Sequence, residues 1–546
     1  MKKEQPLEAT AVNGRNWLVN ILLHQCHIFD SSLSLFLTIF TIRLINALTL
    51  RTYFQADEYW QALEPAHRLI YGYGYLTWEW RLGLRSFLHP LLYSVVYRAC
   101  DYLNLSYLYV LNLPKVLDAL IATVGEFYLV KLMRKITMSE YVSRLTLLLS
   151  LLSSFNWYCS TRSFSNTLEM HLTTIALFYF PMRQADHGRP AISLVIAAIC
   201  CTVRPTNGIL WLYFGVKYAF SHPWKERVTA MIIAATAGFT VVTLDMIVNG
   251  WYYGSLQIPL LKFFEFNVTK SLSSFYGVSR PDFYFLQAIP VLTLTFLPFF
   301  LYGIYSAKGL GDLKMAMLIY LIAFSFIQHK EFRFIYPLMP FLLLFTSYGI
   351  LGLLKLWSRK VSKMVLALLV LTSCGISFYF SIYHESGVIE ITTILRDKVL
   401  DDNRRTGETI DIGFLTPCHS TPYQSHFHLD PSLANIWFLT CEPPLHLDSA
   451  EGIKHYRDES DQFYDDPSGF LDSNFPKFNS TGQLLPSGKY PHDRWPQYLV
   501  IFQHLEPFMK QYLSRSDYVE EERIFNSRFH WDYRRTGDLI IYRRPD

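Results

Sequence analysis

Residues 228–248 read VTAMIIAATAGFTVVTLDMIV and carry one charged side chain, Asp245. A straight helix needs about 20 predominantly apolar residues to cross the hydrocarbon core of a bilayer. Similar runs recur from residue 31 to residue 384. Charged residues make up 17% of the 546-residue chain, against about 25% in soluble domains. The sequence therefore predicts an α-helical polytopic membrane protein.

About eleven membrane crossings are expected from these apolar runs. They lie at 31–49, 113–132, 143–160, 168–183, 190–203, 206–220, 228–248, 284–305, 311–328, 333–356 and 364–384. The runs 190–203 and 206–220 are short and equally fit one re-entrant hairpin, which leaves the parity unchanged. Residues 88–110 are apolar enough to cross, but a crossing there reverses every later loop. We therefore expect an interfacial or partly embedded segment at 88–110.

Basic residues predict the orientation of the chain. If the N-terminus is cytosolic, alternate loops carry Arg134 and Lys135, Arg183 and Arg189, Lys225 and Arg227, Lys308 and Lys314, then Arg359, Lys360 and Lys363. Such an excess of Lys and Arg is typical of cytoplasmic loops. We expect a cytosolic segment at 1–30 with no cleavable signal, a transmembrane catalytic domain at 31–384 and a lumenal domain at 385–546. The first lumenal loop is expected at 50–112.

The polar C-terminal region reads as a small α/β domain. Its strand-like runs are 409–415, 435–440, 497–502, 518–525 and 538–543, and a helix-like run spans 504–513. Aromatic and β-branched enrichment supports the strands. Cys418 and Cys441 predict a structural disulfide in an oxidising lumen, with redox or metal chemistry as the alternative.

Ionisable and aromatic residues cluster on the side opposite the basic loops. The clusters contain Asp57 and Glu58; Trp78, Glu79 and Trp80; Arg162 and Glu169; Arg204; and His329, Lys330 and Arg333. Ionisable groups at a bilayer cost several kcal/mol unless they face water, a partner or a ligand. We therefore expect a polar cavity at the lumenal boundary.

Each cluster also has a structural explanation. Arg204 precedes Pro205 and fits a helix end with a snorkelling side chain. Glu169 fits an ion pair with Arg162. The tryptophans fit an interfacial aromatic belt, and residues 329–333 fit a solvated loop.

Three strings resemble glycosyltransferase family 22 of the GT-C superfamily. They are His-Lys-Glu-x-Arg-Phe-x-Tyr-Pro at 329–337, Thr-Arg-x-x-Ser-Asn-x-x-Glu at 161–169, and Arg-Pro-Thr at 204–206. The resemblance implies an endoplasmic reticulum mannosyltransferase that uses dolichyl-phosphate mannose at a lumenal site. Within the family, residues 57–61, 74–80 and 417–423 favour the α1,2-transferase that adds the third mannose to the glycosylphosphatidylinositol precursor.

The resemblance also implies inversion at the anomeric carbon. One carboxylate then takes the proton from the acceptor hydroxyl, and fixed cations stabilise the leaving phosphate. We expect Asp57 to be the base, with Glu58 as the fallback. His329, Lys330, Arg333 and Arg204 are expected at the phosphate. Trp78, Glu79, Trp80, Arg162 and Glu169 are expected at the acceptor or sugar.

The expected partners are the two membrane lipid substrates, the mannosyl donor and the mannosylated acceptor. The net charge of +4 and the lack of a groove-reading motif argue against nucleic acid. The first lumenal loop has no Asp-x-Asp pair, and no His/Cys cluster has zinc spacing, so no cofactor or metal requirement is expected.

Three other functions remain open at this level. A lipid transporter or scramblase predicts inverted repeats and polar residues at mid-membrane, and no internal repeat is found. Another family member would act on the dolichol-linked N-glycan precursor or add the fourth mannose of the glycosylphosphatidylinositol precursor. A scaffold subunit without activity would not need the set of acids and cations.

The predicted orientation is testable at Asn479, the acceptor of an Asn-Ser-Thr glycosylation sequence. Only a lumenal segment is glycosylated. We expect the chain made in a eukaryotic host to lose mass on glycosidase treatment, and Asn479→Gln to reduce that shift. A shift that persists unchanged in Asn479→Gln would place the glycan elsewhere and withdraw this support for the orientation.

Overall fold

The computed structural model describes residues 27–29, 31–182, 188–266, 275, 277–445, 447, 450–476 and 495–545, so the predicted glycan site at Asn479 lies outside the described residues. The chain forms two compact units. Unit 1 contains the residues up to Leu50, Leu82–Val96 and Asn112–Phe378, and unit 2 contains Arg51–Arg81, Tyr97–Leu111 and the chain from Tyr379 onward. The segment expected as the first lumenal loop, 50–112, is thus divided between the two units.

Unit 1 is helical. Its helices are α3 (Ser32–Thr49), α6 (Leu88–Tyr102), α7 (Tyr107–Thr137), α8 (Glu140–Leu152), α9 (Ser154–Cys159), α10 (Ser165–Tyr179), α11 (Pro190–Val203), α12 (Gly208–Ser221), α13 (Trp224–Tyr253), α14 (Pro259–Phe264), α15 (Ile289–Thr293), α16 (Leu297–Ser306), α17 (Gly311–Ser325), α18 (Met339–Leu356) and α19 (Arg359–Phe378). The short turns η4 (Pro205–Asn207), η7 (Tyr284–Ala288), η8 (Leu294–Phe296) and η9 (Phe332–Leu338) connect some of them. Parts of α6 and α7 belong to unit 2.

Five helical stretches are long and apolar enough to cross a membrane. They are Ser32–Thr49, Trp224–Tyr253, Tyr284–Ser306, Phe332–Leu356 and Arg359–Thr406. The other predicted crossings lie on α7 and on helices of 15 residues or fewer. The polytopic helical class is therefore confirmed, whereas the count of about eleven crossings stays a prediction. At 15 residues, α6 is too short for a straight crossing.

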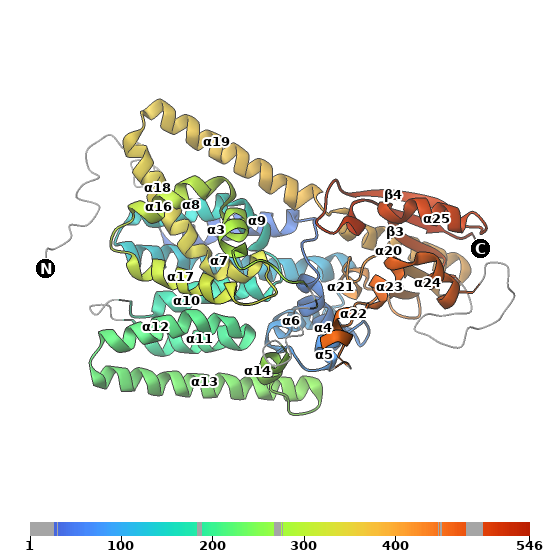
Figure 1. Ribbon diagram of the computed structural model, residues 1–546, viewed down its shortest axis with the longest axis horizontal. Helices are drawn as coiled ribbons and strands as arrows, with labels where there is room; N and C mark the ends of the chain where they lie inside the picture. The colour runs from blue at the N-terminus through green and yellow to red at the C-terminus, as the bar shows by residue number, and fades with distance from the viewer. Residues whose placement is uncertain are drawn as a thin grey trace. The chain divides into compact units, whose positions relative to one another are not determined.

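Helices α16 and α18 lie side by side and touch through their backbones (Figure 1). A Cβ atom on Gly303 would lie 1.7 Å from the carbonyl oxygen of Phe345. A Cβ atom on Gly349 would lie 1.8 Å from the carbonyl oxygen of Phe299. Small residues allow such close approach between membrane helices, so any larger residue at these two positions must push the helices apart.

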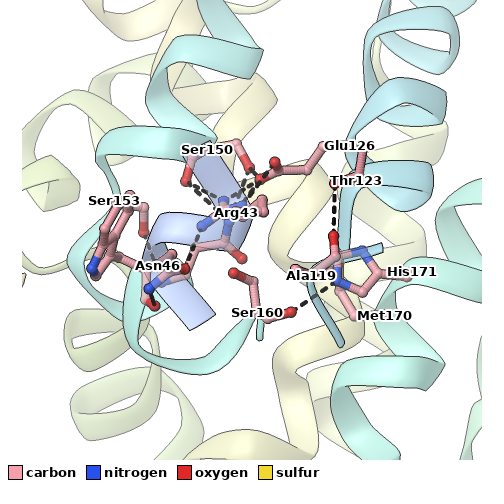
Figure 2. Close-up of polar contacts among 12 residues, drawn as sticks. Arg43, Asn46, Ala119, Thr123, Glu126, Ser150, Ser153, Ser160, Met170 and His171 are labelled. Atoms are coloured by element: carbon pink, nitrogen blue, oxygen red, sulfur yellow. Dashed lines mark hydrogen bonds and ion pairs between the residues drawn. The ribbon is translucent and has the colours of Figure 1, made fainter. Parts of the chain in front are cut away.

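A buried ion pair joins α3 and α7 (Figure 2). Arg43 and Glu126 have side chains that are 0% and 2% exposed, and Arg43 Nε donates to Glu126 at 2.9 Å. Ser150 Oγ on α8 donates to the same carboxylate at 2.7 Å. Asn156 Nδ2 on α9 donates to the Ser150 carbonyl at 3.0 Å, and Tyr336 Oη in η9 donates to Asn156 Oδ1 at 2.6 Å. One connected network thus links five elements.

Unit 2 contains a five-stranded sheet in the order β2-β1-β3-β5-β4. The strands are β1 (Ile410–Phe414), β2 (Ala434–Phe438), β3 (Tyr498–Phe502), β4 (Val519–Ser527) and β5 (Gly537–Arg543). β1 is parallel to β2 and β3, and β5 is antiparallel to β3 and β4. The five predicted strands and the α/β class of the region are confirmed.

Helices cover both faces of this sheet. The helices on the two faces are α20 (Gly387–Thr406), α23 (Glu459–Asp465), α24 (Pro467–Asn474) and α25 (Glu506–Leu513). Unit 2 also contains the shorter helices η3 (Tyr59–Leu63), α4 (Glu64–Tyr71), α5 (Trp78–Arg81), η10 (Tyr379–Tyr383), α21 (Gln424–Phe427), α22 (Ala450–His455), η11 (Gln503–Leu505) and η12 (Tyr533–Arg535). Leu499 and Ile501 of β3 pack with α23, α24 and α25. Tyr498 points to the other face and donates its hydroxyl to Asp402 of α20 at 2.5 Å. This alternation is why β3 is buried throughout.

The ion pair of Arg43 and Glu126 makes a stability prediction. Arg43→Met leaves the Glu126 charge buried without its partner, which costs about 3–5 kcal/mol. We expect Arg43→Met to lower the melting temperature of the purified protein strongly, and Arg43→Met combined with Glu126→Leu to recover much of the loss. As a control, Arg98→Met removes the partner of Asp101 in an exposed pair and should change little. A double variant less stable than Arg43→Met would contradict this account.

Candidate functional site

The predicted site residues fall into two groups, one in each unit. Unit 1 carries Arg162, Glu169, Arg204, His329, Lys330 and Arg333, and unit 2 carries Asp57, Glu58, Trp78, Glu79, Trp80, Cys418 and Cys441.

In unit 1, Glu169 lies in the second turn of α10 and binds the turn that follows α11. Its carboxylate lies 3.3 Å from Arg204 Nε and accepts a hydrogen bond from Asn207 Nδ2 at 2.8 Å. Pro205 ends α11, and Arg204 takes an extended conformation with φ −141° and ψ 100°. The structure thus pairs Glu169 with Arg204. Arg162, the partner expected from sequence, donates its Nε–H to the Tyr158 carbonyl at 2.8 Å.

Two guanidinium groups share one aromatic ring. The Cζ atom of Arg204 lies 5.4 Å from the ring centre of Phe334, and that of Arg333 lies 5.8 Å from it. Arg333 also lies 5.2 Å from the ring centre of Phe164, just before α10. Both arginines are largely buried, with side chains 12% and 6% exposed. Two buried like charges this close favour an anion.

Glu331 is the internal counter-ion of the 329–333 segment. It accepts from Arg333 Nε at 2.6 Å, and His329 Nε2 lies 3.1 Å from its Oε1. Burial opposes ionisation of Glu331, but Arg333 and His329 outweigh burial and hold its pKa well below the usual range. Burial lowers the pKa of His329, but the hydrogen bond and charge of Glu331 outweigh it, so that the pKa is raised.

Lys330 donates to the Ser279 carbonyl at 3.0 Å. Lys330 and Arg333 are 7% and 5% exposed. The alternative of a solvated loop at 329–333 is therefore wrong for these two cations, because packed protein surrounds them. Their fixed orientation is what electrostatic stabilisation of a developing charge requires.

In unit 2, Asp57 and Glu58 begin the helical turn that runs into η3. The N–H groups of Tyr59 and Trp60 donate to the Ala56 carbonyl at 3.0 and 2.9 Å. Glu58 is 6% exposed, whereas Asp57 is partly exposed. Of the two candidate bases, Asp57 is therefore the more accessible to a substrate.

Trp78 and Trp80 lie on α5 and are 7% and 2% exposed. Trp80 Nε1 donates to the Trp60 carbonyl at 3.0 Å. Tryptophans in an interfacial belt or on an open sugar-binding platform would expose their rings, whereas these two are buried. Trp80 therefore has a packing role in this unit. Between them, Glu79 accepts hydrogen bonds from Gln61 Nε2 at 3.0 Å and Thr77 Oγ1 at 3.1 Å.

The C-terminal stretch 417–423 packs on the first-loop segment within unit 2. Cys418 and Cys441 form a disulfide. Tyr53 Oη donates to the His419 carbonyl at 2.5 Å, and Trp60 Nε1 donates to the Thr421 carbonyl at 3.1 Å. Among the described residues, Cys418, His419 and Cys441 have metal-like proximity, but the disulfide engages both sulfur atoms.

Glu64 is a buried acid that sequence reasoning missed. Its carboxylate accepts from Ser425 Oγ at 2.6 Å and from the Tyr423 N–H at 2.8 Å. Burial raises the pKa of Glu64 to about 7, although these hydrogen bonds oppose the rise. Acids are common in the first turn of a helix, so the local sequence around Glu64 gave no signal that this carboxylate is buried. By contrast, Arg43 and Glu126 were detectable as charged residues inside two predicted crossings.

A separate cavity of about 510 Å³ opens among α7, α10, α12 and α17. Its lining includes Lys135, Phe180, Lys217 and Leu310. It contains none of the predicted site residues, so the candidate chemistry does not lie there.

Comparisons with known proteins agree with this helical fold. The solved structure of ArnT from Cupriavidus metallidurans bound to undecaprenyl phosphate resembles the chain with a TM-score of 0.55 at 10% identity, over 93% of this chain and 97% of that one. At that identity the likeness concerns the fold, and it supports the predicted GT-C type.

Relatives of much higher identity cover nearly the whole chain. Proteins named GPI mannosyltransferase 3 are 44% identical in Debaryomyces hansenii over 93% of this chain and 91% of theirs, and 45% identical in Candida albicans over 94% and 98%. The Saccharomyces cerevisiae protein of that name is 33% identical over 95% and 98%. The sequence profile of the Alg9-like mannosyltransferase family matches residues 34–428. The chain therefore belongs to the Alg9-like mannosyltransferase family.

Proposed function

We propose that the protein transfers mannose from dolichyl-phosphate mannose to the glycosylphosphatidylinositol precursor, adding its third mannose in α1,2 linkage. The observation that carries the acceptor is the near full-length similarity to proteins named GPI mannosyltransferase 3. The buried pair of Arg204 and Arg333 supports a phosphate-bearing donor. The proposed location is the endoplasmic reticulum membrane, with the reaction on the lumenal side.

The proposed reaction forms one bond and breaks one. The acceptor hydroxyl oxygen attacks the anomeric carbon, and the bond from that carbon to the phosphate oxygen breaks. The Asp57 carboxylate takes the hydroxyl proton, with Glu58 as the fallback. The electron pair leaves with the phosphate, whose charge the cations stabilise. One base suffices, unlike a glycosidase with its two carboxyl groups.

Arg204, Arg333, His329 and Lys330 are the proposed phosphate ligands. Glu169 and Glu331 orient the two arginines. Each lost contact is expected to cost about 2–4 kcal/mol of transition-state stabilisation. In this proposal fixed cations supply the positive charge, so no divalent metal is required. Arg162 and Glu79 remain candidate contacts for the sugar or the acceptor.

The acceptor can be tested by depleting the protein and identifying the glycolipid that accumulates. We expect a glycosylphosphatidylinositol precursor with two mannoses, because the third transfer is blocked. Re-expression of the wild-type chain should clear it, and re-expression of Arg333→Met should not. Accumulation of a truncated dolichol-linked oligosaccharide would assign the enzyme to the N-glycan precursor instead.

The base can be tested with Asp57→Asn. An amide accepts no proton from the acceptor hydroxyl, so we expect turnover to fall by about 10²–10⁴-fold. Donor binding and melting temperature should stay near wild type. Asp101→Asn, a partly exposed acid in the Arg98 pair, serves as the control and should retain activity. Wild-type turnover in Asp57→Asn would rule out Asp57 as the base.

A further inference from the structure

The N-terminus of α10 lies beside both arginines of unit 1. Arg204 Nη1 donates to Ser165 Oγ at 3.2 Å, and Arg333 lies over the ring of Phe164. Phe164 is the residue before the helix, and no side chain caps the helix start. The first turn of a helix presents N–H groups and a positive partial charge. Three positive features therefore adjoin one another here.

The first N–H groups of α10 remain available. Thr167 and Leu168 donate to the Phe164 carbonyl at 3.1 and 3.2 Å. Over the part of the chain that the structure describes, the N–H groups of Ser165 and Asn166 have no acceptor. Because α10 has 15 residues, its dipole is well developed.

Asn166 supplies a second, independent observation. It is 1% exposed, yet neither its Oδ1 nor its Nδ2 has a hydrogen-bond partner within the described residues. Leaving a buried polar group unpaired costs about 1–3 kcal/mol, and such groups in native proteins call for an explanation. A bound ligand that offers both acceptors and donors provides one.

The helical period places Asn166 on the side of the arginines. Residues three and seven apart share a helix face, so Asn166 lies on the face of Glu169 and Thr173. Glu169 contacts Arg204, and Thr173 Oγ1 accepts from Asn207 Nδ2 at 3.0 Å. The unpaired amide therefore faces the same turn that carries Arg204.

His89 adds a neutral group to this region. It is 5% exposed, and its Nε2 has no partner among the described residues. Burial, followed by the charge of Arg204, lowers the pKa of His89 to about 3. A neutral imidazole near Arg204 can hydrogen-bond a ligand without adding to the repulsion.

We propose that the first turn of α10 and the side chain of Asn166 bind the glycosyl phosphate of the donor, alongside Arg204 and Arg333. This inference rests on the proposed function and adds Asn166 as a binding residue. An amide that lacks both kinds of partner suits a sugar phosphate, because the phosphate offers acceptors and the sugar hydroxyls offer donors. Asn166 Nδ2 donates to the phosphate, and Asn166 Oδ1 accepts from a sugar hydroxyl.

The decisive variant is Asn166→Asp in the full-length purified protein. A carboxylate in the first turn favours the helix, so a purely structural Asn166 would tolerate the change. A carboxylate next to a bound phosphate repels it. We expect the melting temperature to stay within a few degrees of wild type or to rise. We expect the affinity for a short-chain polyprenyl phosphate to fall about tenfold or more.

The matching alcohol, a polyprenol of equal chain length, measures lipid binding without phosphate. Asn46→Asp is the control, because Asn46 is a fully buried amide that accepts from Arg43 and donates to the Trp157 carbonyl. It should keep the preference for phosphate over alcohol. Asn166→Ser removes the amide without adding charge and should weaken phosphate binding by about threefold.

The outcomes separate the two proposals. If the wild-type protein does not prefer polyprenyl phosphate to polyprenol, the proposed phosphate cluster fails. If wild type shows the preference and both Asn166 variants keep it at full strength, the role of Asn166 is overturned while the proposed function stands. If Asn166→Asp fails to fold, the Asn166→Ser affinity alone decides.

Discussion

The buried ion pair between Arg43 and Glu126 is the interaction on which the rest of unit 1 depends. Two charges in a low-dielectric interior persist only if each is paired and hydrogen-bonded. Ser150 and Asn156 complete that bonding, and Tyr336 ties it to η9. Because η9 begins one residue after Glu331 and contains Arg333, the network that pairs two buried charges also holds the backbone of the candidate phosphate cluster.

The same physical rule separates structural from functional charges in this cluster. Glu169 and Glu331 each hold one arginine in place. These ion pairs fix the orientation of the two cations and offset the free-energy cost of burying them. Asn166 and His89 are different, because they form no ion pair and their buried polar atoms have no hydrogen-bond partner within the described residues. A region in which the charges are ion-paired but buried donors and acceptors lack hydrogen-bond partners is one that a polar ligand completes. Fixed dipoles and cations of this kind stabilise a leaving group without reorganising.

Local patterns in the sequence were enough to predict the elements, whereas the pairings needed the structure. Aromatic and β-branched enrichment predicted β1 to β5, and the apolar runs predicted the helices. The contact between Glu169 and Arg204 was not predictable, because Arg204 lies on the turn after a different helix and no local pattern links the two. The division of the first loop was also missed. It depends on contacts such as Glu64 with Ser425, which are 361 residues apart and leave no local signal. The residue types at the candidate site identified its acids and cations from the sequence. The burial of Trp80 was not predicted, because it depends on the packing of the folded chain.

The contacts within unit 2 bear on how a shared fold acquires a particular acceptor. A fold likeness at 10% identity to ArnT says little about substrates, because function resides in the site that a fold carries. Residues 57–61, 74–80 and 417–423 are the stretches that favoured one acceptor from sequence. In the structure they pack together: Trp80 bonds to Trp60, and Trp60 bonds to Thr421. Stretches that are distant in sequence but in direct contact form one packed feature of unit 2, so a change in one stretch alters the surroundings of the others.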